Sequence, residues 1–270
     1  MVSLDQTPLG KSTAYPDRYD PSLLFSIERG PQRMPLGLTA PLPFSGVDIW
    51  TAYEITWLDE RGKPQLAIGE FRVPADSPAT VESKSFKLYL GSFMQERIGT
   101  DTALGRIITA DLLRACGAHV EVRLTRELGR LAIAELPGQS LDEMDLAIDH
   151  FEPQPDALAA DGETVEESLR SSLFKSNCPV TGQPDFGDIL VRYRGRRIDH
   201  RGLLTYLVSF RKHRAFHETC VERIFMDITH RCRPEALTIY GRFTRRGGID
   251  INPFRSNFES PPEDVRTPRQ

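Results

Sequence analysis

The sequence lacks the features that define several whole classes of protein. No apolar run approaches the roughly 18 to 20 residues that cross a bilayer, and the Met-Val-Ser-Leu start has neither the basic stretch nor the apolar core of a signal peptide. The four cysteines of this 270-residue chain include no Cys-x-x-Cys pair, so a disulfide framework is not expected. We therefore expect a cytoplasmic protein without a membrane partner.

The common nucleotide signatures are missing as well. There is no Gly-x-Gly-x-x-Gly after a strand and no Walker loop, so a nucleotide cofactor has to bind outside the usual doubly wound fold. The net charge of −4 predicts no global attraction to nucleic acid. Residues 135–167 hold many carboxylates but no Lys or Arg, which favours an exposed connector near 150–162 or, alternatively, an acidic interaction surface.

Hydrophobic periodicity predicts the same order of elements in both halves of the chain. Strands are expected at 48–57, 65–73, 119–125, 163–174, 189–194, 237–244 and 249–254, and helices at 84–95, 102–116, 199–211 and 215–232. Each half therefore has the order ββαα followed by one or two strands, which is an α+β pattern. The segments 86–93 and 203–210 also align without gaps and share Tyr, Leu, Ser and Phe at equivalent positions, which favours an internal duplication.

One cysteine differs from the others in its surroundings. Cys220 and Cys232 share an apolar helical stripe and Cys116 ends an amphipathic helix, so these three are expected in the core. Cys178 lies in the polar, turn-forming segment Lys-Ser-Asn-Cys-Pro-Val-Thr-Gly-Gln-Pro-Asp. The turns can fold Asp185 back toward the sulfur, and a thiol beside a proton donor can attack an electrophilic carbon.

Other polar residues allow both a structural and a functional interpretation. Glu218 suits the first turn of a helix, whereas His217 beside it can bind a ligand or carry a proton. Glu82 can cap a helix or accept two hydrogen bonds from an amidine-like edge such as that of guanine. Arg245 and Arg246 precede two hairpin glycines and suit phosphate recognition, and the basic stretch 192–214 is a second candidate anion site.

These segments together resemble the NADPH-dependent 7-cyano-7-deazaguanine reductases, the nitrile reductases of queuosine biosynthesis, in their long two-module form. The motifs that carry the resemblance are Leu9-Gly-Lys-Ser-Thr, Pro43-Phe-x-Gly-x-Asp-Ile-Trp, Glu82-Ser-Lys-Ser-Phe-Lys-Leu-Tyr, Lys175 through Asp185, Phe216-His-Glu and Arg245-Arg-Gly-Gly-Ile-Asp-Ile-Asn-Pro. They cover nearly the whole chain.

The resemblance implies tandem tunnelling-fold modules of ββααββ type, with antiparallel sheets and helices on one face. It predicts an extended N-terminal arm at 1–44, a first module at 45–150, an acidic connector at 151–162 and a second module with the cysteine at 163–270. A homodimer is expected, with a small 7-deazaguanine substrate and no direct nucleic-acid partner.

The resemblance also assigns roles to individual residues. Cys178 would be the nucleophile and Asp185 the proton donor, with a covalent thioimide reduced to the amine by two NADPH. The substrate would be held by Val81, Glu82, Ser83, Phe216, His217 and Glu218. NADPH would be held by Ser83, Lys84, Arg246 and Gly247, and no metal is expected.

Three other functions remain open at this point. A metal-dependent cyclohydrolase of the same fold needs a convergent set of ligands, for which His217, Cys220, His230 and Cys232 are the available donors. A thiol hydrolase of the nitrilase kind also begins with a cysteine but does not need two basic segments. A non-catalytic purine- or RNA-binding module would use the stretch 192–214.

Overall fold

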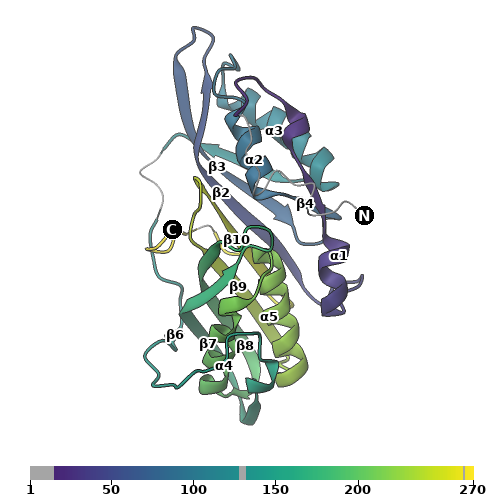
Figure 1. Ribbon diagram of the computed structural model, residues 1–270, viewed down its shortest axis with the longest axis vertical. Coiled ribbons are helices and arrows are strands. Elements are labelled where there is room, and N and C mark those ends of the chain that lie inside the picture. Colours follow the sequence, from purple (N-terminus) through teal and green to yellow (C-terminus); the bar gives the residue numbers. More distant parts are fainter. Residues whose placement is uncertain (1–14, 128–131, 264) are drawn as a thin grey trace. The chain divides into compact units, whose positions relative to one another are not determined.

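The computed structural model describes residues 15–127, 132–263 and 265–270 (Figure 1). The motif at 9–13 lies outside the described residues. The chain forms two compact units. The first takes its described residues from Met1–Met34, Asp48–Leu131 and Arg245–Asp250, and the second from Pro35–Val47, Ala132–Thr244 and Ile251–Gln270.

The described residues of the first unit include three neighbouring strands in the order β5-β3-β2 and the two longer helices α2 and α3. Their bounds are β2 (Ser45–Leu58, in this unit from Asp48), β3 (Pro64–Pro74), β5 (Glu121–Thr125), α2 (Ser83–Gly91) and α3 (Asp101–Cys116). The strands β3 and β5 pair antiparallel, with Gly69 opposite Leu124. Thr100 caps α3 by accepting a hydrogen bond from the Ala103 amide at 3.1 Å, and Gly117 ends it at a φ of 68°.

The described part of the expected N-terminal arm contains short regular elements. These are η2 (Pro21–Leu23), β1 (Ser26–Glu28), α1 (Arg29–Arg33) and η3 (Met34–Leu36). The strand β1 pairs antiparallel with β4 (Ala79–Val81), and the buried Arg29 forms an ion pair with Asp48 at 2.5 Å. These contacts attach the segment to the first unit, and the proposed domain bounds remain a prediction.

The second unit has strands in the order β10-β9-β8-β7-β6 and two helices. Their bounds are β6 (Gln139–Ser140), β7 (Ala160–Asn177), β8 (Pro184–Ile198), β9 (Ala236–Phe243), β10 (Ile249–Ser256, in this unit from Ile251), α4 (His200–Val208) and α5 (His217–Cys232), with short 3₁₀ turns η5 (Pro155–Ala157) and η6 (Ser209–Lys212). β7 to β10 pair antiparallel, whereas the short β6 runs parallel to β7. The predicted α+β class and ββαα order are confirmed.

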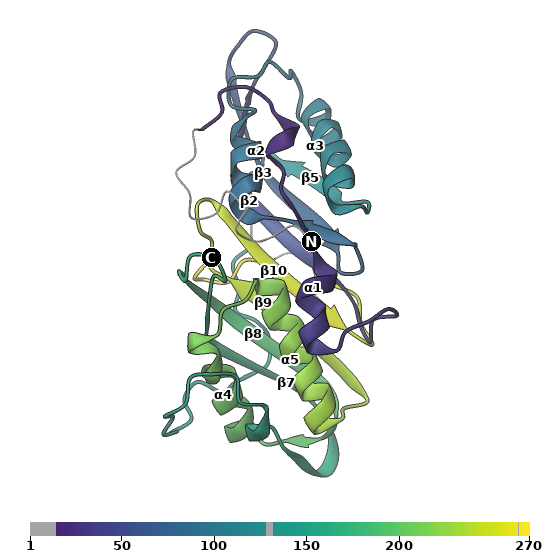
Figure 2. The ribbon, with the colours of Figure 1, turned by 45° about the vertical axis from the view of Figure 1, so that its right-hand side comes forward.

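The helices of the second unit cover one face of its strands (Figure 2). Val221 of α5 lies so close to β9 that a Cβ on Gly241 would stand 2.8 Å from its Cγ2. Because side chains alternate along a strand, Leu190 and Arg192 of β8 point to the opposite face from Ile189 and Val191.

The two helix pairs repeat the same internal hydrogen bonds, which supports the predicted duplication. The hydroxyl of Tyr89 on α2 donates to Asp111 Oδ2 of α3 at 2.6 Å, and that of Tyr206 on α4 donates to Asp227 Oδ2 of α5 at 2.7 Å. The shorter helices α2 and α4 also stop alike. The hydroxyls of Ser92 and Ser209 each donate at 2.6 Å to the carbonyl three residues earlier.

This early stop corrects two of the predicted helix ends. The helices expected at 84–95 and 199–211 end at Gly91 and Val208, and 3₁₀-type turns follow them. A serine hydroxyl that binds a nearby carbonyl competes with the helical ladder. The carboxylates Glu152, Asp156 and Asp161 of the acidic stretch are exposed, whereas Leu158 is buried and β7 already begins at Ala160. No helix of the described residues has the length and apolar character to cross a membrane.

Candidate active site

Cys178 opens the tight loop between β7 and β8 in the second unit. The two strands remain paired up to Asn177 and Pro184, so the loop spans only 178–183. Inside it, the Cys178 amide donates to the Gln183 carbonyl at 2.8 Å, and the Gly182 amide donates to the Cys178 carbonyl at 3.0 Å. Gly182 has a φ of +70°, a conformation that glycine adopts without strain. The turn predicted after the cysteine is confirmed.

The Cys178 thiol is buried rather than open to solvent. Its residue is 3% exposed, because the loop folds over the side chain. The amide of Thr181 donates to Sγ at 3.5 Å. An N–H directed at sulfur is placed to stabilise negative charge there. The sequence suggested an accessible thiol, and the structure instead shows one that is shielded and already has a polar contact.

Asp185 lies on the same hairpin, opposite Ser176 in the β7–β8 register. Residues directly opposite in an antiparallel pair lie on the same face, and Ser176 is two positions before Cys178. The pairing therefore places the Asp185 carboxylate on the same face of the hairpin as Ser176, close to the start of the cysteine loop. Asp185 is 8% exposed, so its side chain is largely shielded from water.

His217 reaches Asp185 from the start of α5. Its Nε2 lies 3.5 Å from Oδ2 of Asp185, and this buried nitrogen has no hydrogen-bond partner among the described residues. The imidazole stacks on the ring of Phe243, with 4.0 Å between centroids and 23° between planes. Phe216, the N-cap residue of α5, makes no side-chain capping bond, and Glu218 is buried in the first turn. The positive start of α5 therefore carries the residue that contacts Asp185 and receives no capping bond from the Phe216 side chain.

The hairpin and the helix start are tied together by the segment between α4 and α5. The Asn177 amide donates to the His213 carbonyl at 2.8 Å, and the Ala215 amide donates to the Asn177 carbonyl at 3.1 Å. Lys175 Nζ donates to the Arg211 carbonyl at 2.6 Å, and burial together with the charge of Arg211 lowers its pKa. Cys178 and His217 are thus positioned by one hydrogen-bonded framework.

The other three cysteines occupy the core, as expected. Burial raises the pKa of Cys220 to about 12 and the pKa values of Cys116 and Cys232 to about 11. These groups remain protonated thiols at neutral pH. All four cysteines are free, and within the described residues no group of three or more His, Cys, Asp or Glu is arranged to hold a metal ion.

In the first unit, Glu82 is the cap of α2. Its two carboxylate oxygens accept hydrogen bonds from the amides of Lys84 and Ser85, each at 2.7 Å, and the residue is 1% exposed. The structure thus confirms that Glu82 caps α2. Oε1 also accepts from the hydroxyl of Ser83 at 3.3 Å, and Oε2 has a second lone pair that can accept from a ligand. The neighbouring Val81 is buried in β4.

The basic turn of the first unit contacts the same helix. Arg246 and Ile249 close a hairpin through a 2.9 Å backbone bond, and Gly247 and Gly248 have φ values of +61° and +81°. A Cβ at Gly247 would lie 3.3 Å from Cδ, Cε and Nζ of Lys87. Lys87 is one turn beyond Ser83 on α2, so both fall on one face of the helix.

Lys87 is the residue of this cluster that sequence reasoning missed. It lies within the Glu82 motif, and its i+4 spacing from Ser83 is the signal that could have identified it. Arg245, by contrast, is engaged by the protein itself, since its guanidinium carbon lies 5.0 Å above the ring of Tyr53.

The arginines at the start of the stretch 192–214, on β8, form ion pairs with carboxylates. Ion pairs join Arg192 to Glu259 at 2.8 Å and Arg194 to Glu235 at 3.1 Å. Arg197 pairs with Glu163 at 2.7 Å. This pattern is typical of a solvated sheet face, and it weakens the interpretation of the β8 part of the stretch as an anion-binding surface.

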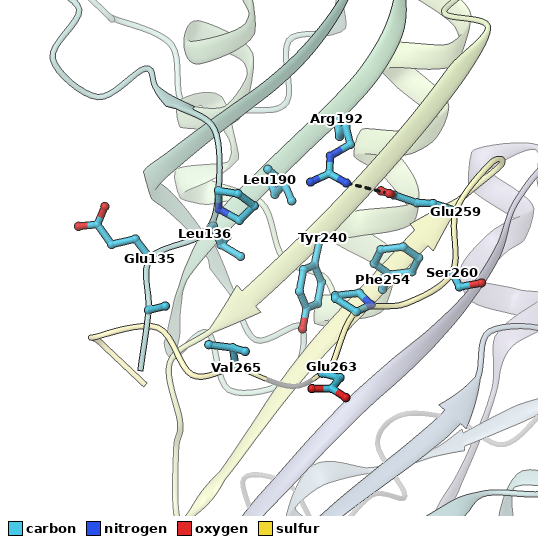
Figure 3. A pocket seen from close by; sticks show the side chains of 13 residues that line it. Glu135, Leu136, Leu190, Arg192, Tyr240, Phe254, Glu259, Ser260, Glu263 and Val265 are labelled. Carbon is cyan, nitrogen blue, oxygen red and sulfur yellow. Dashed lines mark hydrogen bonds and ion pairs between the residues drawn. The ribbon is translucent and has the colours of Figure 1, made fainter. Parts of the chain in front are cut away.

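A separate cavity of about 250 Å³ lies in the second unit, away from Cys178 and Asp185 (Figure 3). Leu190, Tyr240 and Phe254 contribute one side chain each from β8, β9 and β10, and the Arg192–Glu259 ion pair borders the apolar wall. These residues lie on the face of the strands opposite α5. The cavity therefore takes no part in the cysteine site.

The chain is similar to known protein families and to individual proteins with related names. Residues 15–124 match the family described as nitrile reductase, 7-cyano-7-deazaguanine-reductase N-term, and residues 184–262 match the family described as QueF-like protein. Proteins named NADPH-dependent 7-cyano-7-deazaguanine reductase from Burkholderia multivorans and Bordetella parapertussis are 55% and 56% identical to this chain. The alignments cover 98% and 100% of this chain and 99% and 100% of the relatives. A solved archaeosine synthase QueF-Like is 16% identical with a TM-score of 0.32, over 37% of this chain and 99% of that one.

Proposed function

The chain belongs to the 7-cyano-7-deazaguanine reductase family, and on that premise we propose that it reduces the nitrile of 7-cyano-7-deazaguanine to the amine of 7-aminomethyl-7-deazaguanine with NADPH, in queuosine biosynthesis. The observation that carries the proposal is the cluster of Cys178, Asp185 and His217 at one hairpin and one helix start, within a chain that aligns with its relatives over nearly its full length.

Cys178 is the proposed nucleophile. Its thiolate attacks the nitrile carbon, a C–S bond forms, and one π bond of the nitrile becomes a lone pair on nitrogen. That nitrogen takes a proton, and the product is a neutral thioimide. The Thr181 amide, which already points at Sγ, supports the charge on sulfur before attack. Burial of Cys178 keeps water from the sulfur, and water would otherwise hydrolyse the thioimide.

Asp185 is the proposed proton donor, and His217 supports it. The carboxyl group of Asp185 is buried and lies 3.5 Å from His217 Nε2, a placement that suits proton donation to the nitrile nitrogen. His217 Nε2 at 3.5 Å can replace that proton or hold the carboxylate after transfer. The uncapped start of α5 stabilises the resulting negative charge.

Ser83, Lys84, Arg246 and Gly247 are the proposed NADPH contacts, and Lys87 joins them. The fit rests on the Gly247 position, where the missing side chain leaves the Lys87 ammonium close to an exposed backbone turn. Two lysines and one arginine beside glycine backbone suit a phosphate. When bound, NADPH supplies hydride, and two equivalents are required because reduction of a nitrile to an amine takes four electrons.

Glu82 is the proposed anchor for the deazaguanine, with Val81, Ser83, Phe216, His217 and Glu218 as further substrate contacts. Glutamate is not among the favoured N-cap residues, which are Ser, Thr, Asp and Asn. The equivalent position in the second half is Asp199, an ordinary cap that accepts from the amides of Arg201 and Gly202. The longer side chain at Glu82 is explained if the carboxylate also binds the amidine edge of the base.

The competing functions have less support. The described residues offer no metal-ligand group for a cyclohydrolase, and three of the arginines that an RNA-binding module would use, Arg192, Arg194 and Arg197, are paired with carboxylates. A cytoplasmic homodimer, built from two modules with the bounds given above and free of direct nucleic-acid contacts, completes the proposal.

The proposal is tested by mixing the purified protein with 7-cyano-7-deazaguanine without NADPH and measuring intact mass. We expect an adduct with the mass of the whole substrate, absent in Cys178→Ala and lost when NADPH is added. Cys232→Ala, which removes a buried thiol from the far end of α5, serves as the matched control and should still form the adduct. An adduct that persists in Cys178→Ala, or ammonia release in place of reduction, would contradict the proposal.

A further inference from the structure

The ring of Phe243 lies directly under the imidazole of His217, and no role has been assigned to it above. Phe243 is the last residue of β9 and is fully buried. The two rings are 4.0 Å apart with 23° between their planes, which is a stacked arrangement. The imidazole thus rests on a flat apolar surface while its Nε2 edge points toward Asp185 at 3.5 Å.

Two glycines make room for this ring. Gly187 of β8 lies opposite Phe243 in the register, and a Cβ there would stand 3.1 Å from Cδ1 of Phe243. A Cβ on Gly241 would stand 3.0 Å from Cε2 of the same ring. Phe174 closes another side with its ring edge-on at 5.9 Å. Because Gly187 is two residues from Asp185 on the same strand, the ring occupies the place next to the carboxylate.

The backbone of Phe243 is fixed at both of its polar groups. Its amide donates to Oδ1 of Asn252 at 3.1 Å, and its carbonyl accepts from Nε2 of Gln270 at 2.8 Å. Gln270 in turn accepts from Nε and Nη2 of Arg242 at 2.9 and 2.6 Å. All of these groups are buried, so the ring has little freedom to move.

We propose that Phe243 is a positioning residue for the nitrile reduction, which holds the imidazole of His217 in line with Asp185. The inference builds on the proposed function. His217 has no hydrogen bond of its own at Nε2 among the described residues, so the stacking contact supplies the orientation that a hydrogen bond would otherwise give. Stacked aromatic pairs contribute beyond the area that they bury, and an imidazolium on an aromatic face gains a further attraction.

The kinetic test compares Phe243→Leu, which keeps apolar bulk but removes the flat face, with Phe243→Tyr, which keeps it. We expect Phe243→Leu to lower kcat about ten- to a hundred-fold with KM changed less than about three-fold, since misplacing a proton-transfer group costs rate rather than binding. Phe243→Tyr should restore most of the rate.

The matched control is Phe225→Leu. Phe225 is equally buried in the same unit, on α5, but its ring contacts Phe44 and not His217. It should lower thermal stability comparably and leave kcat within about two-fold, as expected for a core substitution remote from the reacting groups. Equal loss of kcat in Phe243→Leu and Phe225→Leu, or no recovery in Phe243→Tyr, would overturn the inference.

A second readout does not depend on turnover. In protein with ¹³C-labelled histidine, stacking on Phe243 should shift the ring protons of His217 upfield, with the signal assigned by its loss in His217→Asn. The shift should vanish in Phe243→Leu and persist in Phe225→Leu. If His217 shows no such shift in the unmodified protein, the stacking inference fails. If the shift is present but no nitrile is reduced, the proposed function fails instead.

Discussion

The first and second halves build the same helix pair but start its helices differently. α2 and α4 begin at equivalent positions, capped by Glu82 in one half and by Asp199 in the other. α3 is capped by Thr100, whereas the equivalent helix α5 follows Phe216 and has no side-chain cap. The shared Tyr–Asp hydrogen bonds show that the scaffold is common. The two halves therefore differ in the capping residues at the starts of their helices, and these starts include the proposed ligand contacts Glu82 and Phe216.

A second difference separates the first residues of α2 and α4. In the second half this position is His200, whose Nε2 lies 3.1 Å from Glu167 Oε2, and Glu167 also accepts from Tyr193 at 2.6 Å. In the first half the position is Ser83, a proposed contact for substrate and cofactor. The same place on the scaffold serves a structural cluster in one half and a proposed ligand site in the other.

The largest expected effect comes from exchanging the caps. Glu82→Asp gives the first half the cap of the second, so the free energy of unfolding should stay within about 1 kcal/mol of the original. The shorter side chain should not reach the base, and affinity for 7-cyano-7-deazaguanine should fall by about 2 kcal/mol or roughly 30-fold. Calorimetric titration and thermal unfolding measure the two effects separately.

The control for this exchange is Asp199→Ala. It removes an ordinary cap and should cost about 1 kcal/mol of stability with no change in affinity. If Glu82→Asp binds the substrate with unchanged affinity, Glu82 acts only as a helix cap. The two halves then do not differ in function at this position.

A smaller effect is expected from capping the open helix. Phe216→Ser offers α5 a side-chain acceptor and should contribute up to about 1 kcal/mol of stability. The serine would also compete for the helix start near Asp185, so kcat should fall several-fold. The counterpart Thr100→Ala should cost about 1 kcal/mol and leave activity intact. If Phe216→Ser is active at the original rate, the uncapped start has no part in catalysis.

The smallest expected effect concerns pH and the Glu167 cluster. Burial opposes ionisation of Glu167, but the bonds from Tyr193 and His200 and the charge of Arg197 leave its pKa below the usual range. A lowered folded-state pKa contributes stability above the usual glutamate pKa and loses it as the pH falls. The melting temperature of Glu167→Gln should therefore lie below that of the original protein at pH 7, with the difference shrinking below about pH 4.

The matched control for that series is Glu166→Gln, on the adjacent and exposed position of β7. A pH-independent difference for Glu167→Gln, or the same behaviour in Glu166→Gln, would show that the cluster does not distinguish α4 from α2.

The sequence was sufficient for the long strands and helices and for the distinct setting of Cys178, because both depend on local pattern. Alternation and i+4 spacing located the strands and helices, and the polar turn separated Cys178 from the three core cysteines. Where a helix stops depends on one serine rotamer, so the ends at Gly91 and Val208 were missed. The contact of Phe243 with His217 joins β9 to α5 through tertiary packing, and no local pattern reports it.

The burial of Cys178 has a practical consequence for anyone who labels this protein. With this residue 3% exposed and the other three thiols in the core, a bulky maleimide reaches sulfur only when the 178–183 loop opens. The rate of modification then reports the frequency of that opening rather than the intrinsic reactivity of the thiol. The time course of alkylation therefore measures how often the loop opens, and saturating substrate should slow the alkylation.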